Sequence, residues 1–271
     1  MRQVTRAMST SYPTDLTDEQ WELLSSLIPP ESRACRPRHV DLRAVMSAIF
    51  YILCAGCAWR MLPHDFPKWQ TVYYYFRKWR IDGTWERMNH KLQQWVRVVE
   101  NREPNPSAAI VDCQSVENGT MVSKDVGFDS GKLVKGRKRH FLVDTLGLVL
   151  MVVVTSAYAS DQAGAKTLFA QAKQRISDRL NRLTCIWVDA GYQGQGFMKW
   201  VMDTYHWILE VVRRPNDAKG FVLLPKRWVV ERSFGWFNWC RRLSKDYEIL
   251  PQTHETFVQV AMIRLMLRRL A

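Results

Sequence analysis

The sequence predicts a mixed α/β domain, in which helices flank a mixed sheet, preceded by a smaller domain built from helices. Three observations support this prediction. Apolar residues recur at helical spacing between residues 14 and 100, the polar, proline-containing segment NREPNPS follows, and short apolar runs then alternate with helical segments. Strands that alternate with helices indicate a sheet covered by helices. We therefore expect a helical N-terminal domain (1–100), a linker (101–107) and an α/β domain (108–271).

Helices are expected throughout the N-terminal domain. The first follows Thr17, which stands three residues before Gln20 in the pattern of a capping box. The second follows the N-cap residue Asp41, and its apolar side chains recur at helical spacing in LRAVMSAIFYIL. The third, TVYYYFRKWR, is expected to begin at a Thr71 cap and to end at an Asp-Gly dipeptide. The segment TWERMNHKLQQWVRVVE supplies a further helix.

The α/β domain opens with AAIVDC, an apolar strand expected to end at Asp112. The segment RKRHFLVDTLGLVLMVVVTSA is expected to form two strands that turn between residues 145 and 147. A helix (DQAGAKTLFAQAKQRISDRL), a buried strand that ends at Asp189 (TCIWVDA), a helix beginning in GQGFMKWVMDTY and a strand (HWILEVVRR) follow. Two helices, PKRWVVERSFGWFNWCRRL and THETFVQVAMIRLMLRRL, complete the sequence.

The balance of charges restricts the partners of the protein. Lysine and arginine number 39 against 26 acidic residues, which gives a net charge of +13. A field of this sign attracts polyanions, of which nucleic acid and anionic membrane surfaces are the usual examples. No apolar run reaches the roughly 20 residues of a membrane-spanning helix, and no secretory signal is expected at the N-terminus. Nucleic acid is therefore the expected partner.

The six cysteines favour a reduced, cytoplasmic protein. Cys54 and Cys57 form a C-x-x-C pair in an apolar helical segment, but no second pair or Cys/His group follows at zinc-like spacing. Buried free thiols are common in such segments. No Walker pattern occurs, so no nucleotide cofactor is expected.

Three acidic residues are candidates for a metal site. Asp112 and Asp189 are each expected to end a buried strand, where open α/β sheets usually place their sites. Glu231 is the only glutamate in the basic, aromatic stretch between Pro225 and Tyr247. Phosphoryl transfer uses two divalent ions about 3.5–4 Å apart, and carboxylates are ligands that suit Mg²⁺. Taken singly, each aspartate is more often a cap or turn residue, and the glutamate could be a surface ion-pair partner.

Several stretches together resemble bacterial insertion-sequence transposases of the IS5 group, within the IS4-like DDE superfamily. They are LTDEQWELL, WRMLPHDFPKWQTVYYYFRKWRIDGTWERM, VDCQSV, GRKRHFLVDTLGL, VDAGYQG and RWVVERSFGWFNWCRRLSKDYE. The resemblance implies an RNase H-like core whose catalytic, metal-binding triad is Asp112, Asp189 and Glu231, with two Mg²⁺ or Mn²⁺ ions. It also implies binding to terminal inverted repeats, metal-dependent DNA cleavage and strand transfer. The expected partners are double-stranded DNA, at the transposon ends and the target, and a second copy of the chain on nucleoid DNA.

Basic residues in and around these motifs are expected to contact DNA phosphate. They are Arg77, Lys78, Arg80, Arg137, Lys138, Arg139, Arg227, Arg232, Arg241 and Arg242. Arg227 lies one helical turn before Glu231, so the two should share a helix face. Related transposases carry Tyr and Lys at the positions of Leu224 and Asn238, and Arg241 or Arg242 would compensate for that difference.

The N-terminal helices, with RKWR and the basic loop SRACRPRH, have the features of a DNA-reading domain. Tyr73, Phe76 and Trp79 fit a simple core equally well. His140 and Asp144 fall on one strand face and could assist the metals, although His140 is more often structural or a phosphate contact and Asp144 a turn residue.

Asp161 is expected to cap a helix. Tyr192, in a turn that Gly191 and Gly194 allow, could stack on DNA. Two other functions share these features: an RNase H-fold nuclease that cuts without joining, and a domesticated regulator that only binds DNA. The presence of all three acids counts against the regulator.

Overall fold

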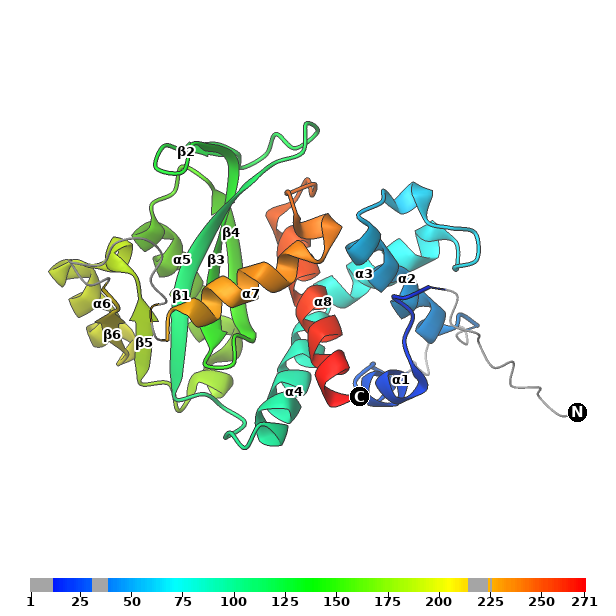
Figure 1. Cartoon of the computed structure of the whole chain (residues 1–271), viewed down its shortest axis with the longest axis horizontal. Helices are drawn as coiled ribbons and strands as arrows, with labels where there is room; N and C mark the ends of the chain where they lie inside the picture. Colours follow the sequence, from blue (N-terminus) through cyan, green and yellow to red (C-terminus); the bar gives the residue numbers. More distant parts are fainter. Residues whose placement is uncertain (1–11, 31–38, 214–223, 225) are drawn as a thin grey trace, which may run out of the picture.

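The structure is a computed structural model that describes residues 12–30, 39–213, 224 and 226–271 (Figure 1). It contains a mixed sheet with helices on both faces and a group of helices from the N-terminal part of the chain, which confirms the predicted fold class. Most of the basic loop SRACRPRH lies outside the described residues. Among the residues that are described, no helix is long and apolar enough to cross a bilayer.

The N-terminal helices follow the predicted order. They are α1 (Asp18–Ser25), α2 (Leu42–Ala55), the 3-10 helix η1 (Trp59–Met61), α3 (Trp69–Ile81) and α4 (Thr84–Val99). Thr17 and Asp41 cap α1 and α2 as predicted: each side-chain oxygen accepts a backbone N–H, at 3.2 Å and 2.8 Å. The start predicted at Thr71 is wrong. Its N–H already donates to the carbonyl of Lys68 within the first turn of α3.

Within the described residues, the sheet has six strands. They are β1 (Ala108–Glu117), β2 (Gly127–Asp129), β3 (Val134–Asp144), β4 (Val149–Ser156), β5 (Cys185–Val188) and β6 (Ile208–Val211). Their order is β2-β3-β1-β5-β6, and β4 also pairs with β3. β3 is antiparallel to β1, β2 and β4, whereas β5 is parallel to β1 and β6. The predicted hairpin is confirmed as β3 and β4, with Gly147 at φ +81° in its turn.

β1 is longer than the sequence predicts, so Asp112 lies inside the strand rather than at its end. The polar second half of β1 remains extended because it pairs with β3 as far as Glu117, which lies opposite Gly136. Asp189 lies where the sequence predicts, immediately after the last residue of β5.

The remaining helices cover the two faces of the sheet. They are α5 (Asp161–Ile176), η2 (Ser177–Leu180), η3 (Ala190–Tyr192), α6 (Gln195–Tyr205), α7 (Trp228–Asn238), η4 (Arg241–Leu243) and α8 (Pro251–Leu270). The helix predicted to run on to residue 243 therefore ends earlier, and η4 is a separate turn. Figure 1 shows α8 between the N-terminal helices and the sheet.

Each face of the sheet has its own apolar core. Val111 and Leu142 face α5 and α6, where they pack with Phe169. Ile110 and Phe141 face the opposite way, into a core shared by α7, α8 and the N-terminal helices. The strand alternation that buries Ile110 on this second face also directs Asp112 toward α7.

Candidate active site

The three predicted acids come from three separate segments of the chain. Asp112 and Asp189 are neighbours because β1 and β5 are parallel: Ile110 pairs with Trp187, and the same offset two residues further on places Asp112 opposite Asp189. Glu231 lies in the first turn of α7, which packs against β1. Sheet register and helix packing together bring these segments to one region of the molecule.

A single guanidinium lies among the three carboxylates. Arg227 immediately precedes α7, and its Nε lies 3.8 Å from Asp112 Oδ2. Its Nη2 lies 3.9 Å from Asp189 Oδ2 and 3.4 Å from Glu231 Oε1. The last pair is four residues apart, which confirms that Arg227 and Glu231 share a helix face. Arg227 therefore contacts all three predicted acids.

The three carboxylates differ in their surroundings. Burial raises the pKa of Asp112 to about 6, and the charge of Asp189 acts in the same direction, while Arg227 and the N–H of Cys113 oppose it. Asp189 Oδ1 accepts the N–H of Gly191 at 2.8 Å and so caps η3. The Glu231 side chain is 46% exposed, whereas that of Asp112 is 10% exposed. The site thus extends from the interior to the surface.

The donor set fits a divalent cation. Carboxylate oxygens are hard ligands of the kind that Mg²⁺ prefers. Burial is the main cause of the raised pKa of Asp112, so a bound cation would stabilise the charged form of this carboxyl. Over the described part of the chain, no three Asp, Glu, His or Cys side chains are close enough to hold one ion as they stand. Here the acids surround the guanidinium of Arg227 instead.

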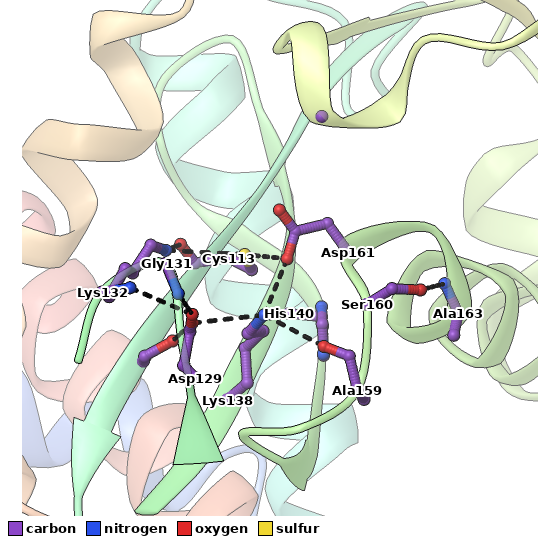
Figure 2. A network of polar contacts seen from close by, with 12 residues as sticks. Cys113, Asp129, Gly131, Lys132, Lys138, His140, Ala159, Ser160, Asp161 and Ala163 are labelled. Atoms are coloured by element: carbon purple, nitrogen blue, oxygen red, sulfur yellow. Dashed lines mark hydrogen bonds and ion pairs between the residues drawn. The ribbon is translucent and has the colours of Figure 1, made fainter. Parts of the chain in front are cut away.

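A buried polar network supports β1 behind Asp112 (Figure 2). The ammonium of Lys138, on β3, donates to Asp161 Oδ1 at 2.9 Å and lies 3.3 Å from Asp129 Oδ2. Asp161 Oδ1 also accepts from the thiol of Cys113 at 3.1 Å. Burial raises the pKa of that thiol to about 12, so it keeps its proton and can donate. Because Cys113 directly follows Asp112, the network fixes the backbone that carries Asp112.

This network could not be found from local sequence patterns. The expectation that Asp161 caps α5 is wrong: the hydroxyl of Ser160 accepts from the N–H of Ala163 at 3.2 Å and is the cap. Asp161 is the first residue of the helix and binds Lys138 on a strand. Only the packing of α5 against β3 brings the two side chains together.

Several basic residues predicted to contact phosphate are buried inside the protein. They are Arg137, Lys138, Arg139 and Arg242. β3 lies between β1 and β4, and other segments cover both faces of the sheet, so side chains of this strand are shielded from solvent. Arg137 pairs with Asp246 at 3.0 Å, and Arg242 pairs with Glu248 at 2.6 Å. The prediction that these residues bind DNA phosphate is therefore wrong.

The other predicted phosphate contacts differ in exposure. Those with exposed side chains are Arg77, Lys78 and Arg241, and those with partly exposed side chains are Arg80, Arg227 and Arg232. Arg232 is held between two rings, with its guanidinium carbon 4.5 Å from the Trp228 centroid and 4.9 Å from that of Trp236. It also donates to the carbonyl of Leu146 at 2.9 Å. The three exposed residues are the ones most available to phosphate.

Other candidate residues have structural positions. Tyr192 is fully buried, so the prediction that it stacks on DNA is wrong. Phe76 and Trp79 are buried in the core next to α8, as the hypothesis of a simple core predicts, whereas Tyr73 is 39% exposed and does not belong to that core. Asp144 is a turn residue as predicted, and its Oδ2 also forms a buried ion pair with Arg97 at 2.7 Å.

His140 is a core residue rather than a phosphate contact. Its ring is fully buried, and its Nε2 lies 3.0 Å from Thr155 Oγ1. α5 packs directly on the ring at Gly164, where an added Cβ would collide with the imidazole. Burial, with a smaller effect of the Lys138 charge, lowers the pKa of His140 from 6.5 to about 4. The imidazole is therefore neutral at pH 7.

We expect this neutral imidazole to make part of the stability depend on pH. Between pH 6.5 and 4 the unfolded chain binds a proton that folded His140 does not, so its contribution is present above pH 6.5 and is lost as the pH falls. The variant His140→Gln should be less stable than the parent protein at pH 8 by about 1–3 kcal/mol. Between pH 8 and pH 4.5, the difference in the free energy of unfolding between the variant and the parent protein should shift by about 2–3 kcal/mol in favour of the variant. Urea denaturation at several pH values would measure it, and a constant difference would contradict a neutral His140.

The sequence matches two families. The family described as "Putative transposase of IS4/5 family" matches residues 16–89. The family described as "Transposase DDE domain" matches residues 103–266, which is more than half of the chain. No solved structure matches the sequence significantly.

The chain is also similar to two proteins of Burkholderia cepacia. It is 29% identical over 107 residues to the insertion element IS402 uncharacterized 16.2 kDa protein, a match that covers 37% of this chain and 71% of that protein. It is 27% identical over 128 residues to a putative transposase for insertion sequence element IS402, covering 46% of this chain and 60% of that protein.

Proposed function

Because this chain belongs to the DDE transposase family, we propose that it binds the terminal inverted repeats of an insertion sequence and catalyses their cleavage and strand transfer. The mixed sheet flanked by helices is the RNase H-like fold that the family implies. The family also implies dependence on a divalent metal. We assign the metal to Asp112, Asp189 and Glu231, with two Mg²⁺ or Mn²⁺ ions.

One observation supports this assignment most directly. Carboxylates from β1, from the residue after β5 and from α7 all lie within 3.9 Å of one guanidinium. In a chain with a net charge of +13, three acids gathered at one point require a reason other than surface solvation. Binding of cations that neutralise DNA phosphate during phosphoryl transfer is such a reason.

The three acids would bind the metal ions differently because their positions differ. Asp112, the most buried of them, would bind both ions, while Asp189 and Glu231 would each bind one. When bound, the ions supply the positive charge that stabilises the attacking and leaving oxygens at phosphorus. The network of Lys138 and Asp161 would hold β1 still, so that the Asp112 carboxylate stays in place through successive cleavage and joining steps.

The exposed basic residues would position the DNA. Arg77 and Lys78 lie on α3, and Arg241 lies on η4, which packs against the end of α2. These phosphate contacts would come from both halves of the chain. We propose a homodimer that bridges two transposon ends and works on nucleoid DNA in the cytoplasm, because joining both ends of an element requires two active sites in one complex.

A strand-transfer assay tests this function. Pre-cut terminal-repeat DNA, taken from the sequences that flank the gene, is incubated with the protein, a plasmid target and Mg²⁺. We expect terminal 3′ ends to become joined to the plasmid, and EDTA to abolish the products. Cleavage of uncut ends without any joined product would favour a nuclease. Specific binding without either reaction would favour a DNA-binding regulator.

A further inference from the structure

We infer that Arg227 is the resident counter-ion of the metal-free site, and that divalent cations and this guanidinium compete for the same three carboxylates. The inference rests on the proposed role of Asp112, Asp189 and Glu231 as metal ligands. It goes beyond that role because it assigns Arg227 a control over when the site accepts metal.

The contacts of Arg227 are those of a loosely held cation. Its three N–O distances are 3.4, 3.8 and 3.9 Å. By contrast, the buried pair of Arg97 and Asp144 is hydrogen-bonded at 2.7 Å. The Nε of Arg227 is buried and has no hydrogen-bond partner. Charge, rather than directed hydrogen bonding, therefore keeps the guanidinium among the acids, and a stronger cation could displace it at little cost in broken hydrogen bonds.

The balance of charge favours such an exchange. One guanidinium offsets only part of the charge of three carboxylates. A Mg²⁺ ion carries twice the charge and binds oxygen at about 2.0–2.1 Å, so each carboxylate gains more from the ion than from Arg227. The two cannot both lie at the centre of the acids, because the ion would then face a positive group at short range. Metal binding thus requires Arg227 to leave.

The surroundings of Arg227 allow its side chain to move away from the three acids. Its side chain is 22% exposed, so the guanidinium lies at the edge of the site rather than under it. The preceding residue, Lys226, has a φ of +70° and is anchored with its Nζ 4.5 Å from the Trp187 ring centroid. Because this contact is made by Lys226, the Arg227 side chain can change rotamer without breaking it. A DNA phosphate at the site would attract the released guanidinium and so favour metal binding.

Binding of Mn²⁺ measured without DNA tests this competition. Electron paramagnetic resonance of free Mn²⁺ gives the affinity directly, independently of catalysis. We expect Arg227→Gln to bind Mn²⁺ about tenfold more tightly than the parent protein, because the competing charge is gone. Arg227→Lys keeps a charge and should lie between the two. The control Lys173→Gln removes an exposed charge on α5, on the face of the sheet opposite α7, and should change the affinity less than about twofold.

A phosphate-bearing ligand extends the test. A short DNA duplex should tighten Mn²⁺ binding to the parent protein, because phosphate draws Arg227 away, and by linkage Mn²⁺ should tighten duplex binding by the same factor. In Arg227→Gln this coupling should be largely lost. If Arg227→Gln binds Mn²⁺ no more tightly than the parent protein while Glu231→Gln binds it more weakly, the proposed competition is wrong. The assignment of the metal ligands then still stands. If Glu231→Gln also leaves the Mn²⁺ affinity unchanged, both the competition and the assignment of the metal ligands are wrong.

Discussion

Replacing Glu231 by glutamine should lower Mg²⁺-dependent nicking of terminal-repeat DNA by at least about a hundredfold while leaving binding to the same DNA nearly unchanged. Glutamine keeps the shape of the side chain and the first turn of α7, but it lacks the negative charge that a hard divalent cation requires. Binding should persist, since the basic residues remain and one repulsive charge is removed. Nicking and gel-shift assays on one substrate separate the two effects.

The matched control is Glu210→Gln. Glu210 lies on β6 and is 53% exposed; it accepts the indole N–H of Trp187 at 2.8 Å, has its Oε1 3.5 Å from Lys226 Nζ, and is not one of the three proposed metal ligands. Its loss should cost about 0–1 kcal/mol and leave nicking almost unchanged. If Glu231→Gln behaved like this control, Glu231 would be a surface ion-pair residue and the proposed triad would lose its third member.

Asp246→Ala is expected to lower the free energy of unfolding by about 3–5 kcal/mol. Asp246 and Arg137 are both fully buried, with Oδ2 and Nη1 3.0 Å apart. The other carboxylate oxygen of Asp246, Oδ1, lies 3.0 Å from His254 Nδ1 and accepts the N–H of Glu248 at 2.9 Å. Burial alone would raise the pKa of Asp246, but His254, that N–H and Arg137 outweigh it and lower the pKa to about 2. Alanine would leave Arg137 buried without its counter-charge.

The neighbouring residue supplies the control for this prediction. Lys245 Nζ lies 2.6 Å from Glu117 Oε2, but the two side chains are 49% and 61% exposed. Lys245→Ala should therefore leave the free energy of unfolding nearly unchanged, because solvent screens an exposed ion pair. Urea denaturation of the three proteins at pH 7 gives both values. A loss below about 1 kcal/mol in Asp246→Ala would show that the backbone carbonyls around Arg137 suffice to stabilise its charge.

The strands and helices of the core could be predicted because their apolar periodicity is local information. The hairpin of β3 and β4 and the strand that ends before Asp189 lie where that periodicity indicates. The position of Asp112 inside β1 could not be predicted in this way. The polar residues that follow it have no strand pattern of their own and are extended only because β3 pairs with them.

The basic residues show more clearly what local sequence patterns cannot predict. A run such as Arg137 to Arg139 predicts a solvated, phosphate-binding surface when judged by charge alone. These side chains are buried because their strand is central and because partners distant in sequence, such as Asp246, neutralise them. The contact of Arg227 with Glu231 follows from helical spacing, whereas its contacts with Asp112 and Asp189 depend on sheet register.

The central position of α8 affects how the chain matures on the ribosome. α8 packs against α1, α2 and α4 on one side, and its Glu255 accepts the N–H of Val154 on β4 at 2.9 Å. During synthesis, the N-terminal helices and the whole sheet emerge before α8 does. The apolar surfaces that pack against α8 therefore stay exposed until α8 has been synthesised. The core between the two halves can therefore close only after α8 has been synthesised, and a nascent chain that stops before Pro251 would expose both halves to chaperones and proteases.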